Sequence, residues 1–477
     1  MTRIQLRCRS SLPWPVRAGG WPCFRRIGMH SRRATPERGP SLSCTIPMPG
    51  STRRSSDRVR PWRSGSSMVL VRKLRDRLAT QARALPVARH AWARYRRRRY
   101  EERIERFLSE RTGRADRLPI GAVYEATMRC NLHCEFCYVG DLLNIEGEWQ
   151  QELDLDALSR AFPTHDGFQV SLTGGEIFMR KDIMSVLDLF REKGYACGYL
   201  TTNGTIITDD RAEALADLAA LGFLKHISVS IDGPKELHDE ARGLKGTFER
   251  TCAGLRRLQD AARKKQAPLR VSINTTVAHE SLDALDQMVD VAQELGVDAI
   301  GLNHLMYSTP EEVAETVRLI GAPDASVVAT FVTADPGIDV RKVREKVAAL
   351  QQKCKDRNIL FDFRPKVHPP LMDNYYTPGT KLEGRCLYPF LHARVSFSGK
   401  VYFCPFIRVE VGDLSKNSLE EVWNGERYVE MRRRLLENGI FPVCRRCCKV
   451  ELSPEPVAVA ADDQSRARRA IPLTVVR

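Results

Sequence analysis

Three cysteines in one short stretch, Cys130-Asn131-Leu132-His133-Cys134-Glu135-Phe136-Cys137, decide the fold and the chemistry of this chain. Three thiolates so close together can bind three irons of a four-iron cluster, which leaves the fourth iron open to a small ligand. A structural zinc ion is the alternative, but it needs four ligands, and His133 would have to supply the fourth from inside the loop. We therefore predict a [4Fe–4S] cluster bound by Cys130, Cys134 and Cys137.

The cysteine stretch follows the first of six short apolar segments, and segments with helical periodicity lie between them. This alternation predicts parallel strands joined by right-handed crossovers. Six such units favour an α/β fold, a partial (β/α)6 TIM-like barrel, in which functional residues lie at the C-terminal ends of the strands. The expected strands are 122–127, 169–173, 198–202, 226–231, 270–276 and 299–303, and the expected helices lie near 154–162, 181–193, 209–220, 247–265 and 282–295.

Glycine and polar residues follow the second, third and fourth expected strands. Thr173-Gly174-Gly175-Glu176 ends the second strand, where glycines allow the backbone to approach a ligand closely. Asn203 ends the third strand, Ser230 lies at the end of the fourth, and Arg242 follows in the next segment. Asn-Gly and Asp-Gly-Pro sequences are also ordinary turns. Their occurrence at successive strand ends nevertheless favours one shared ligand pocket.

The cysteine triplet, with the aromatic Phe136 directly before its third cysteine, resembles the signature of the radical S-adenosylmethionine (SAM) superfamily. The resemblance implies that SAM chelates the open iron and is cleaved reductively to a 5′-deoxyadenosyl radical, which abstracts hydrogen from a substrate. The cofactor would carry this chemistry, and the protein would supply binding and orientation. The resemblance also implies SAM-binding roles for Phe136, Gly174, Gly175, Glu176, Asn203, Ser230 and Arg242. Glu176 would contact the methionine amino group and Arg242 the methionine carboxylate, although Ile177 replaces the proline that often follows this glutamate in the family.

A second group of cysteines lies in the C-terminal part of the chain. Cys386 and Cys404 flank a predicted hairpin turn at Ser398-Gly399, and Cys444 and Cys447 form a CxxC pair. Four thiolates suit either a [4Fe–4S] cluster or a tetrahedral zinc ion.

The spacing C-x12-G-x4-C, together with Gly412-Asp413-Leu414 and the segment 419–424, resembles a SPASM-type extension, a region that binds auxiliary [4Fe–4S] clusters. A full SPASM region continues with further cysteines, whereas no cysteine follows Cys448 here. The prediction is therefore a SPASM-like extension with one auxiliary [4Fe–4S] cluster, held by Cys386, Cys404, Cys444 and Cys447. Cys448 is either a substitute ligand or a bystander.

The net charge of +16 is concentrated at the N-terminus. Fourteen Arg and two acids give residues 1–67 a charge of +12, sixteen basic and six acidic residues give 68–117 a charge of +10, and the remainder carries −6. A basic surface for phosphates is thus missing from the part that can fold, and no nucleic-acid partner is expected. The predicted domains are a disordered Arg-rich tail or segment upstream of a true start (1–67), a basic helical arm (68–117), a radical SAM core barrel (118–310), a helical connecting region (311–383), a SPASM-like auxiliary cluster domain (384–452) and a tail (453–477).

These features predict a radical SAM oxidoreductase or maturase-type enzyme that oxidises or cross-links a peptide or small molecule, with an electron donor such as flavodoxin or ferredoxin. The alternatives are a non-enzymatic iron–sulfur redox or sensor protein and a lipid- or nucleic-acid-modifying radical SAM enzyme. No run of eighteen apolar residues indicates a membrane span. We expect a cytoplasmic protein, with 68–117 as either a solvated arm or a peripheral membrane contact. Asp362, Tyr375 and His304 are candidates for the barrel mouth by position alone.

Overall fold

The computed structural model describes residues 102, 106, 110–115, 118–164, 168–279 and 281–453. All of them lie in the second of two compact units, Ala82–Arg477. The predicted segment 1–67, most of the predicted arm 68–117 and nearly all of the tail 453–477 lie outside the described residues, so these three predictions stay predictions.

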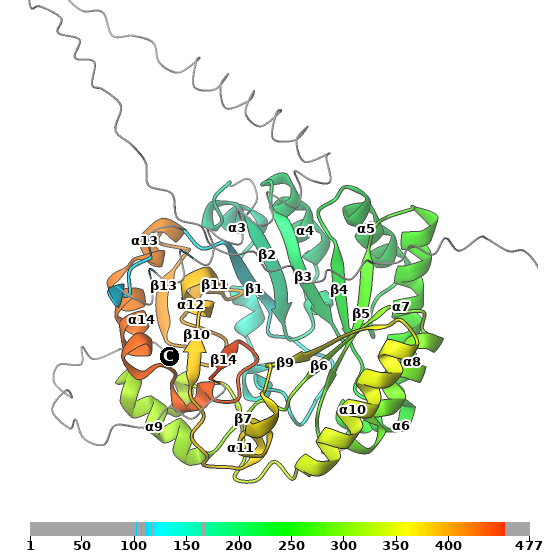
Figure 1. Cartoon of the computed structure of the whole chain (residues 1–477). Helices are drawn as coiled ribbons and strands as arrows, with labels where there is room; N and C mark the ends of the chain where they lie inside the picture. Colours follow the sequence, from blue (N-terminus) through cyan, green and yellow to red (C-terminus); the bar gives the residue numbers. More distant parts are fainter. Residues whose placement is uncertain are drawn as a thin grey trace, which may run out of the picture. The chain divides into compact units, whose positions relative to one another are not determined.

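A ten-stranded sheet forms the centre of the described region, in the order β13-β12-β11-β1-β2-β3-β4-β5-β6-β9 (Figure 1). Its strands are β1 (Gly121–Thr127), β2 (Gln169–Gly174), β3 (Ala196–Thr202), β4 (His226–Ser230), β5 (Arg270–Thr276), β6 (Ala299–Asn303), β9 (Leu360–Arg364), β11 (His392–Val395), β12 (Lys400–Tyr402) and β13 (Glu410–Asp413). Two small sheets pair β7 (Tyr307–Ser308) with β8 (Phe331–Val332) and β10 (Gly384–Cys386) with β14 (Val450–Leu452).

The pairing confirms the predicted α/β fold with a mostly parallel sheet. Strands β1 to β6 pair in parallel in chain order, β9 continues beyond β6, and β11 pairs in parallel with the free side of β1. Within the ten-stranded sheet, β11, β12 and β13 pair antiparallel to one another. Within the described residues β13 and β9 are the two edges of the sheet, so the barrel is open, as expected.

The sheet is larger than the six predicted strands. The region 311–383, predicted to be helical, also contributes β9, a short strand that the sequence analysis overlooked. The hairpin predicted around Ser398-Gly399 is present, but it extends the main sheet instead of forming a sheet of its own. Strands from the barrel and from the C-terminal region therefore form one continuous sheet.

Figure 1 shows α4, α5, α7 and α8 lying along the outside of the curved sheet. The α-helices are α3 (Leu155–Ala161), α4 (Ile183–Glu192), α5 (Asp209–Ala220), α6 (Lys235–Ala241), α7 (Thr247–Lys264), α8 (Met288–Glu294), α9 (Pro310–Ile320), α10 (Val340–Asp356), α11 (Met372–Tyr376), α12 (Tyr388–Leu391), α13 (Leu419–Trp423) and α14 (Glu426–Asn438). The 3-10 helices are η1 (Gly140–Leu142), η2 (Glu148–Gln151), η3 (Ile177–Met179), η4 (Leu282–Gln287), η5 (Ala325–Val327), η6 (Pro369–Leu371) and η7 (Pro442–Cys444).

Local sequence signals fix several helix starts. Asp154 and Thr208 accept backbone N–H groups at the starts of α3 and α5, which satisfies donors that a helix leaves free at its first turn. Thr309 and Ser418 form capping boxes, with a glutamate three residues later, at α9 and α13.

One hydrophobic core joins the barrel strands to the C-terminal region. Tyr124, Phe162 and Phe190 pack edge to face between β1, the end of α3 and α4, with ring centroids 5.0–5.9 Å apart. The same continuous apolar cluster runs from Ala115 to Leu452. In the part of the chain that the structure describes, no helix has both the length and the hydrophobicity to cross a bilayer.

Candidate functional site

The cysteine loop begins directly after β1, at its C-terminal end. Asn144 holds the start of the loop, because its side chain accepts the Cys130 N–H at 2.9 Å and donates to the Cys130 carbonyl at 3.0 Å. A turn bond from the Cys137 N–H to the Cys134 carbonyl, 3.2 Å long, folds the second half of the loop. All three thiols are partly accessible, and His133, which a zinc site would need, is exposed.

The Gly174-Gly175 pair locks the end of β2 against the residues that precede the cysteine loop. The N–H of Gly175 donates to the Thr127 carbonyl at 2.9 Å, and the N–H of Glu176 donates to the Arg129 carbonyl at 2.8 Å. Gly174 has a φ of +138°, and a Cβ atom on Gly175 would lie 2.3 Å from the Arg129 carbonyl oxygen. Glycine is therefore required here for the close approach of two loops.

The Glu176 carboxylate is fully enclosed and already holds three protein donors. It accepts the Thr202 hydroxyl at 2.8 Å, the Asn203 N–H at 2.6 Å and the Phe178 N–H at 3.2 Å. Burial raises its pKa despite these hydrogen bonds. Glu176 is 1% exposed and does not line the cavity described below. Its carboxylate ties the ends of β2 and β3 together, and the predicted contact with the methionine amino group stays a prediction.

Asn203 connects the end of β3 to the cysteine loop. Its side-chain amide donates to the Asn131 side-chain oxygen at 3.0 Å, and its own side-chain oxygen accepts the Thr205 N–H at 2.9 Å. The Asn131 amide in turn donates to the Thr205 hydroxyl at 2.9 Å. Asn131, between the first two cysteines of the triplet, is thus held by the loop after β3.

Arg242 brings the end of β4 to the same loop. Its guanidinium is ion-paired with the buried Asp232 and lies 3.6 Å from the Cys134 sulfur. The guanidinium carbon also lies 5.7 Å from the centre of the Phe136 ring. Its Nε atom is buried and has no hydrogen-bond partner among the described residues, so one donor remains free beside the cysteines.

Ser230 lies at the mouth of the barrel, 8% exposed, and lines a cavity together with Phe136, Cys134, Cys137 and Arg242. The structure thus brings four predicted elements, the cysteine loop, the end of β2, Asn203 and the Ser230–Arg242 segment, to one end of the barrel. Asn203, Gly174 and Gly175 stand behind the loop and do not line the cavity.

The C-terminal cysteines form a second group. Strand β10 pairs with β14 so that Cys386 lies opposite Val450, which places it beside the CxxC turn, where the Cys447 N–H donates to the Cys444 carbonyl at 3.1 Å. The Cys404 sulfur accepts the Ile407 N–H at 3.2 Å. The pKa of the Cys444 thiol is raised by burial and then by the neighbouring Cys404 and Cys386, so these thiols lie close together.

Cys448 differs from the four predicted ligands because it faces the barrel cavity. A hydrogen bond from the Cys447 thiol is the main cause that lowers the pKa of Cys448 to about 6. Burial opposes this shift, whereas the positive charges of Lys449 and Arg364 add to it. Cys386, Cys404, Cys444 and Cys447 do not line that cavity.

The donor chemistry of both cysteine groups fits iron–sulfur clusters. Burial raises the pKa of Cys130 to about 11, of Cys404 to about 11 and of Cys386 to about 12, and buried thiols of this kind become thiolates when a metal binds them. Among the described residues, no three His, Cys, Asp or Glu side chains converge tightly enough to share one ion. One zinc ion would draw every sulfur to about 2.3 Å from a single centre, whereas a cube spreads its thiolates over several irons. The three or four cysteine sulfurs of each group suit such a cluster.

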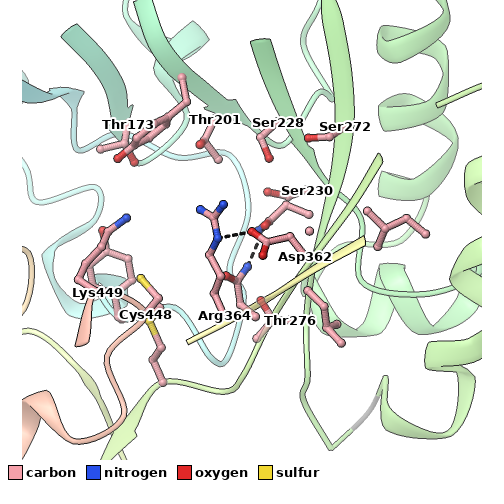
Figure 2. A pocket seen from close by; sticks show the side chains of 18 of the residues that line it. Thr173, Thr201, Ser228, Ser230, Ser272, Thr276, Asp362, Arg364, Cys448 and Lys449 are labelled. Atoms are coloured by element: carbon pink, nitrogen blue, oxygen red, sulfur yellow. Dashed lines mark hydrogen bonds and ion pairs between the residues drawn. The ribbon is translucent and has the colours of Figure 1, made fainter. Parts of the chain in front are cut away.

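A cavity of about 700 Å³ opens beside the first cysteine group (Figure 2). Its wall consists of the inward-pointing residues of β2 to β6 and β9, completed by Arg394, Phe406, Cys448 and Lys449 from the C-terminal region. Figure 2 shows the hydroxyls of Thr173, Thr201, Ser228 and Ser272 in a row along one side, with Arg364 pointing into the space before them. Of the three candidates named by position, Asp362 lines the cavity, whereas Tyr375 and His304 are buried behind it.

A buried ion network beneath this wall was not predicted from the sequence. The Glu125 carboxylate, in the middle of β1, accepts from Arg394 at 2.7 Å and from Arg408 at 2.7 Å. Arg394 also donates to the hydroxyl of Tyr138, the residue after Cys137, at 3.2 Å. A lone charged residue inside an apolar strand, Val123-Tyr124-Glu125-Ala126, was the available signal, because such a charge requires a partner.

Two family models match this arrangement. Residues 124–292, which contain the triplet, match the radical SAM superfamily, and residues 386–448 match an iron–sulfur cluster-binding domain, SPASM. The chain belongs to the radical SAM superfamily. This radical SAM enzyme therefore uses SAM and a [4Fe–4S] cluster, and its SPASM domain is of a kind that binds auxiliary iron–sulfur clusters.

Relatives of this radical SAM enzyme differ in what they act on. The chain is 25% identical to the AdoMet-dependent heme synthase of Oleidesulfovibrio alaskensis over 324 residues, 65% of this chain and 76% of the relative. It is 32% identical to the PqqA peptide cyclase of Ruegeria pomeroyi over 182 residues, 37% of this chain and 45% of the relative. Among solved structures it resembles Streptococcus suis SuiB bound to the precursor peptide SuiA, with 15% identity, a TM-score of 0.49 and coverage of 70% and 71%.

Proposed function

We propose that this radical SAM enzyme abstracts hydrogen from a substrate held in the barrel cavity and thereby oxidises or cross-links it. The single observation that carries the proposal is that Cys134 and Cys137 line the same cavity as Ser230 and Arg242. A cofactor at the cysteine loop and a substrate in the cavity would then share one enclosed space. The bound cluster and SAM supply the reductive cleavage that yields a 5′-deoxyadenosyl radical.

In this proposal Cys130, Cys134 and Cys137 hold the cluster, and the loop ends hold SAM. The free Nε donor of Arg242 and the adjacent Phe136 ring support a contact with an anionic or polar part of SAM. Gly174 and Gly175 shape the loop behind the cysteines, and Glu176 and Asn203 fix the loop's position through Thr202 and Asn131. Ser230 offers its hydroxyl from the cavity wall.

We further propose a single auxiliary [4Fe–4S] cluster on Cys386, Cys404, Cys444 and Cys447. Its support is the mutual proximity of these buried thiols and the different orientation of Cys448, which faces the cavity. Such a cluster would lie next to the cavity wall, since Cys447 and Cys448 are adjacent, and could accept the electron that remains after hydrogen abstraction and proton loss. A cytoplasmic location and a flavodoxin- or ferredoxin-type electron donor complete the proposal.

Anaerobic reconstitution of the full chain tests the proposal. The dithionite-reduced protein should convert SAM to 5′-deoxyadenosine, whereas Cys134→Ala should abolish this product. Cys354→Ala is the matched control, because Cys354 is a buried thiol in α10 outside both cysteine groups, and it should retain the activity. A fully iron-loaded wild type that leaves SAM intact would instead support a non-enzymatic redox or sensor role for this chain.

Whether the substrate is a peptide, a small molecule, a lipid or a nucleic acid is a separate question. Residues 68–117 lie largely outside the described residues, so binding to lipid is tested by liposome flotation of the chain with and without this segment. Equal flotation of the two proteins would reject a membrane contact through 68–117. RNA binding that persists without residues 1–117 and weakens with salt would contradict the expectation of no nucleic-acid partner.

A further inference from the structure

The cavity wall carries more positive than negative charge. Its lining contains one acidic side chain, Asp362, against five basic ones. The basic side chains are Arg242, Arg270, Arg364, Arg394 and Lys449. Such an imbalance next to a reaction centre selects for the charge of what binds there.

Three of the five cations are paired with carboxylates. Arg394 pairs with Glu125 and Arg242 with Asp232, and both pairs are buried. Arg364 pairs with Asp362, its neighbour on β9 (Figure 2). These pairs position the wall, and the Glu125 carboxylate is shared between Arg394 and Arg408.

Arg270 and Lys449 have no such partner. No acidic side chain among the described residues lies within ion-pair distance of either one, although the lining brings both to the same cavity. Both residues are exposed, and the Lys449 amino group lies 5.9 Å from the centre of the Tyr199 ring, which also lines the cavity. They come from distant parts of the chain, the start of β5 and the turn after the CxxC pair. Two cations that line one cavity without a carboxylate partner among the described residues indicate an anionic occupant.

The rest of the lining is suited to an organic molecule. Ser228 and Ser272 are register neighbours on β4 and β5, and His226 is hydrogen-bonded to Ser272 at 2.8 Å. The lining also contains apolar side chains such as Phe361 and Phe406. A volume of about 700 Å³ also lies within the range of about 300–1,000 Å³ that is typical of small-molecule sites.

We propose that the substrate of this enzyme is a small organic anion, bound through its carboxylate or phosphate groups by Arg270 and Lys449. This inference rests on the proposed function, because it takes the cavity beside Cys134 and Cys137 as the substrate site. The two cations hold the charged ends of the molecule, and the hydroxyl row and the aromatic side chains contact its body.

Binding measurements on the reconstituted, SAM-loaded full chain test this assignment without turnover. The probes are tricarballylate as a carboxylate, inorganic phosphate, and the uncharged triamide of tricarballylate as the neutral control, each followed by calorimetric titration. We expect saturable binding of tricarballylate or phosphate, whichever group the site prefers, and none of the triamide. Lys449→Gln and Arg270→Gln should each weaken binding by roughly tenfold or more, the loss expected for one charge-assisted contact.

Lys264→Gln is the matched control, since Lys264 is an exposed lysine on α7 paired only with Glu213, and it should bind the anion like the wild type. Lys449 is close to the C-terminal cysteines, so the iron content of Lys449→Gln is measured as well. If Lys449→Gln loses iron, the anion affinity of Arg270→Gln, a variant on β5, tests the proposal instead. Equal affinity in all variants, or no saturable binding of either anion by the wild type, would overturn the proposal. Binding of an acidic peptide in place of both small anions would overturn it too. Because 5′-deoxyadenosine formation is measured separately, a failure of anion binding is distinguishable from a failure of the proposed radical chemistry.

Discussion

Removing the charge of Glu125 should destabilise this enzyme more than any exposed charge change. Its pKa falls from an ordinary 4.5 to about 2, because Arg394 and Arg408 together outweigh the burial that would raise it. That difference corresponds to about 3 kcal/mol of stabilisation. Loss of one partner from a buried ion pair independently costs about 3–5 kcal/mol, since the remaining charge stays buried. We therefore expect Glu125→Gln to lower the free energy of unfolding by about 3 kcal/mol.

Urea-induced unfolding of the full chain at neutral pH, followed by tryptophan fluorescence and far-ultraviolet circular dichroism, measures this loss. The matched control is Glu213→Gln, because Glu213 pairs with Lys264 at 3.3 Å and both side chains are more than half exposed, so the loss should stay below about 1 kcal/mol. The pH dependence has a defined sign. The folded pKa of Glu125 lies below the unfolded one, so its stabilisation is complete above about pH 4.5 and is lost as the pH falls toward about 2. Equal losses in the two variants would refute this reasoning.

Three further outcomes are expected. Iron counting should give about eight irons per chain for the wild type, because two four-iron clusters are proposed. Cys448→Ala should keep about eight irons and Cys404→Ala should keep about four, because Cys404 is a proposed ligand and Cys448 is not. Equal iron losses in the two variants would make Cys448 a ligand. Gly175→Ala should lower the melting temperature and the iron content together, since its Cβ would lie 2.3 Å from the Arg129 carbonyl oxygen; unchanged iron content would contradict the close approach of the two loops. Arg242→Met should weaken SAM binding, measured by equilibrium dialysis, by roughly tenfold, and Arg242→Lys should recover part of it; wild-type affinity in both would remove Arg242 from the SAM site.

The parallel part of the fold could be predicted because each strand is buried and followed by a helix. The six predicted strands correspond to β1 to β6 within one or two residues at most of their ends. Strand β9 was overlooked because Leu360-Phe361-Asp362-Phe363-Arg364 is short, partly exposed and carries two charges. The pairing of β11 with β1 could not be predicted at all, since it joins residues about 270 positions apart and leaves no local signal.

Some features of the candidate site could likewise be predicted from the sequence, and others could not. Both cysteine groups could be predicted from the sequence, because the triplet and the CxxC pair each bring thiols close together in sequence, as iron–sulfur sites often do. The cavity cations were not predicted, since Arg270 and Lys449 are polar residues at segment ends, where charges are common. Their convergence depends on the sheet order and on the position of the CxxC turn, which only the structure provides. For Glu176 the structure adds a role that the motif did not indicate, because its carboxylate accepts hydrogen bonds from Thr202 and Asn203 and so holds two strand ends together. Its contact with the methionine amino group stays a prediction.

The C-terminal region lines the barrel cavity as well as carrying the second cysteine group. Arg394 on β11 links Glu125 of β1 to Tyr138, the residue after the last cysteine of the triplet. Lys449, two residues after Cys447, faces the cavity that Cys137 also lines. The SPASM domain therefore supplies a wall of the cavity and a support for the cysteine loop. Changes in this region would alter the shape and charge of the cavity even where every cysteine is retained, which offers one barrel fold a way to accept different substrates.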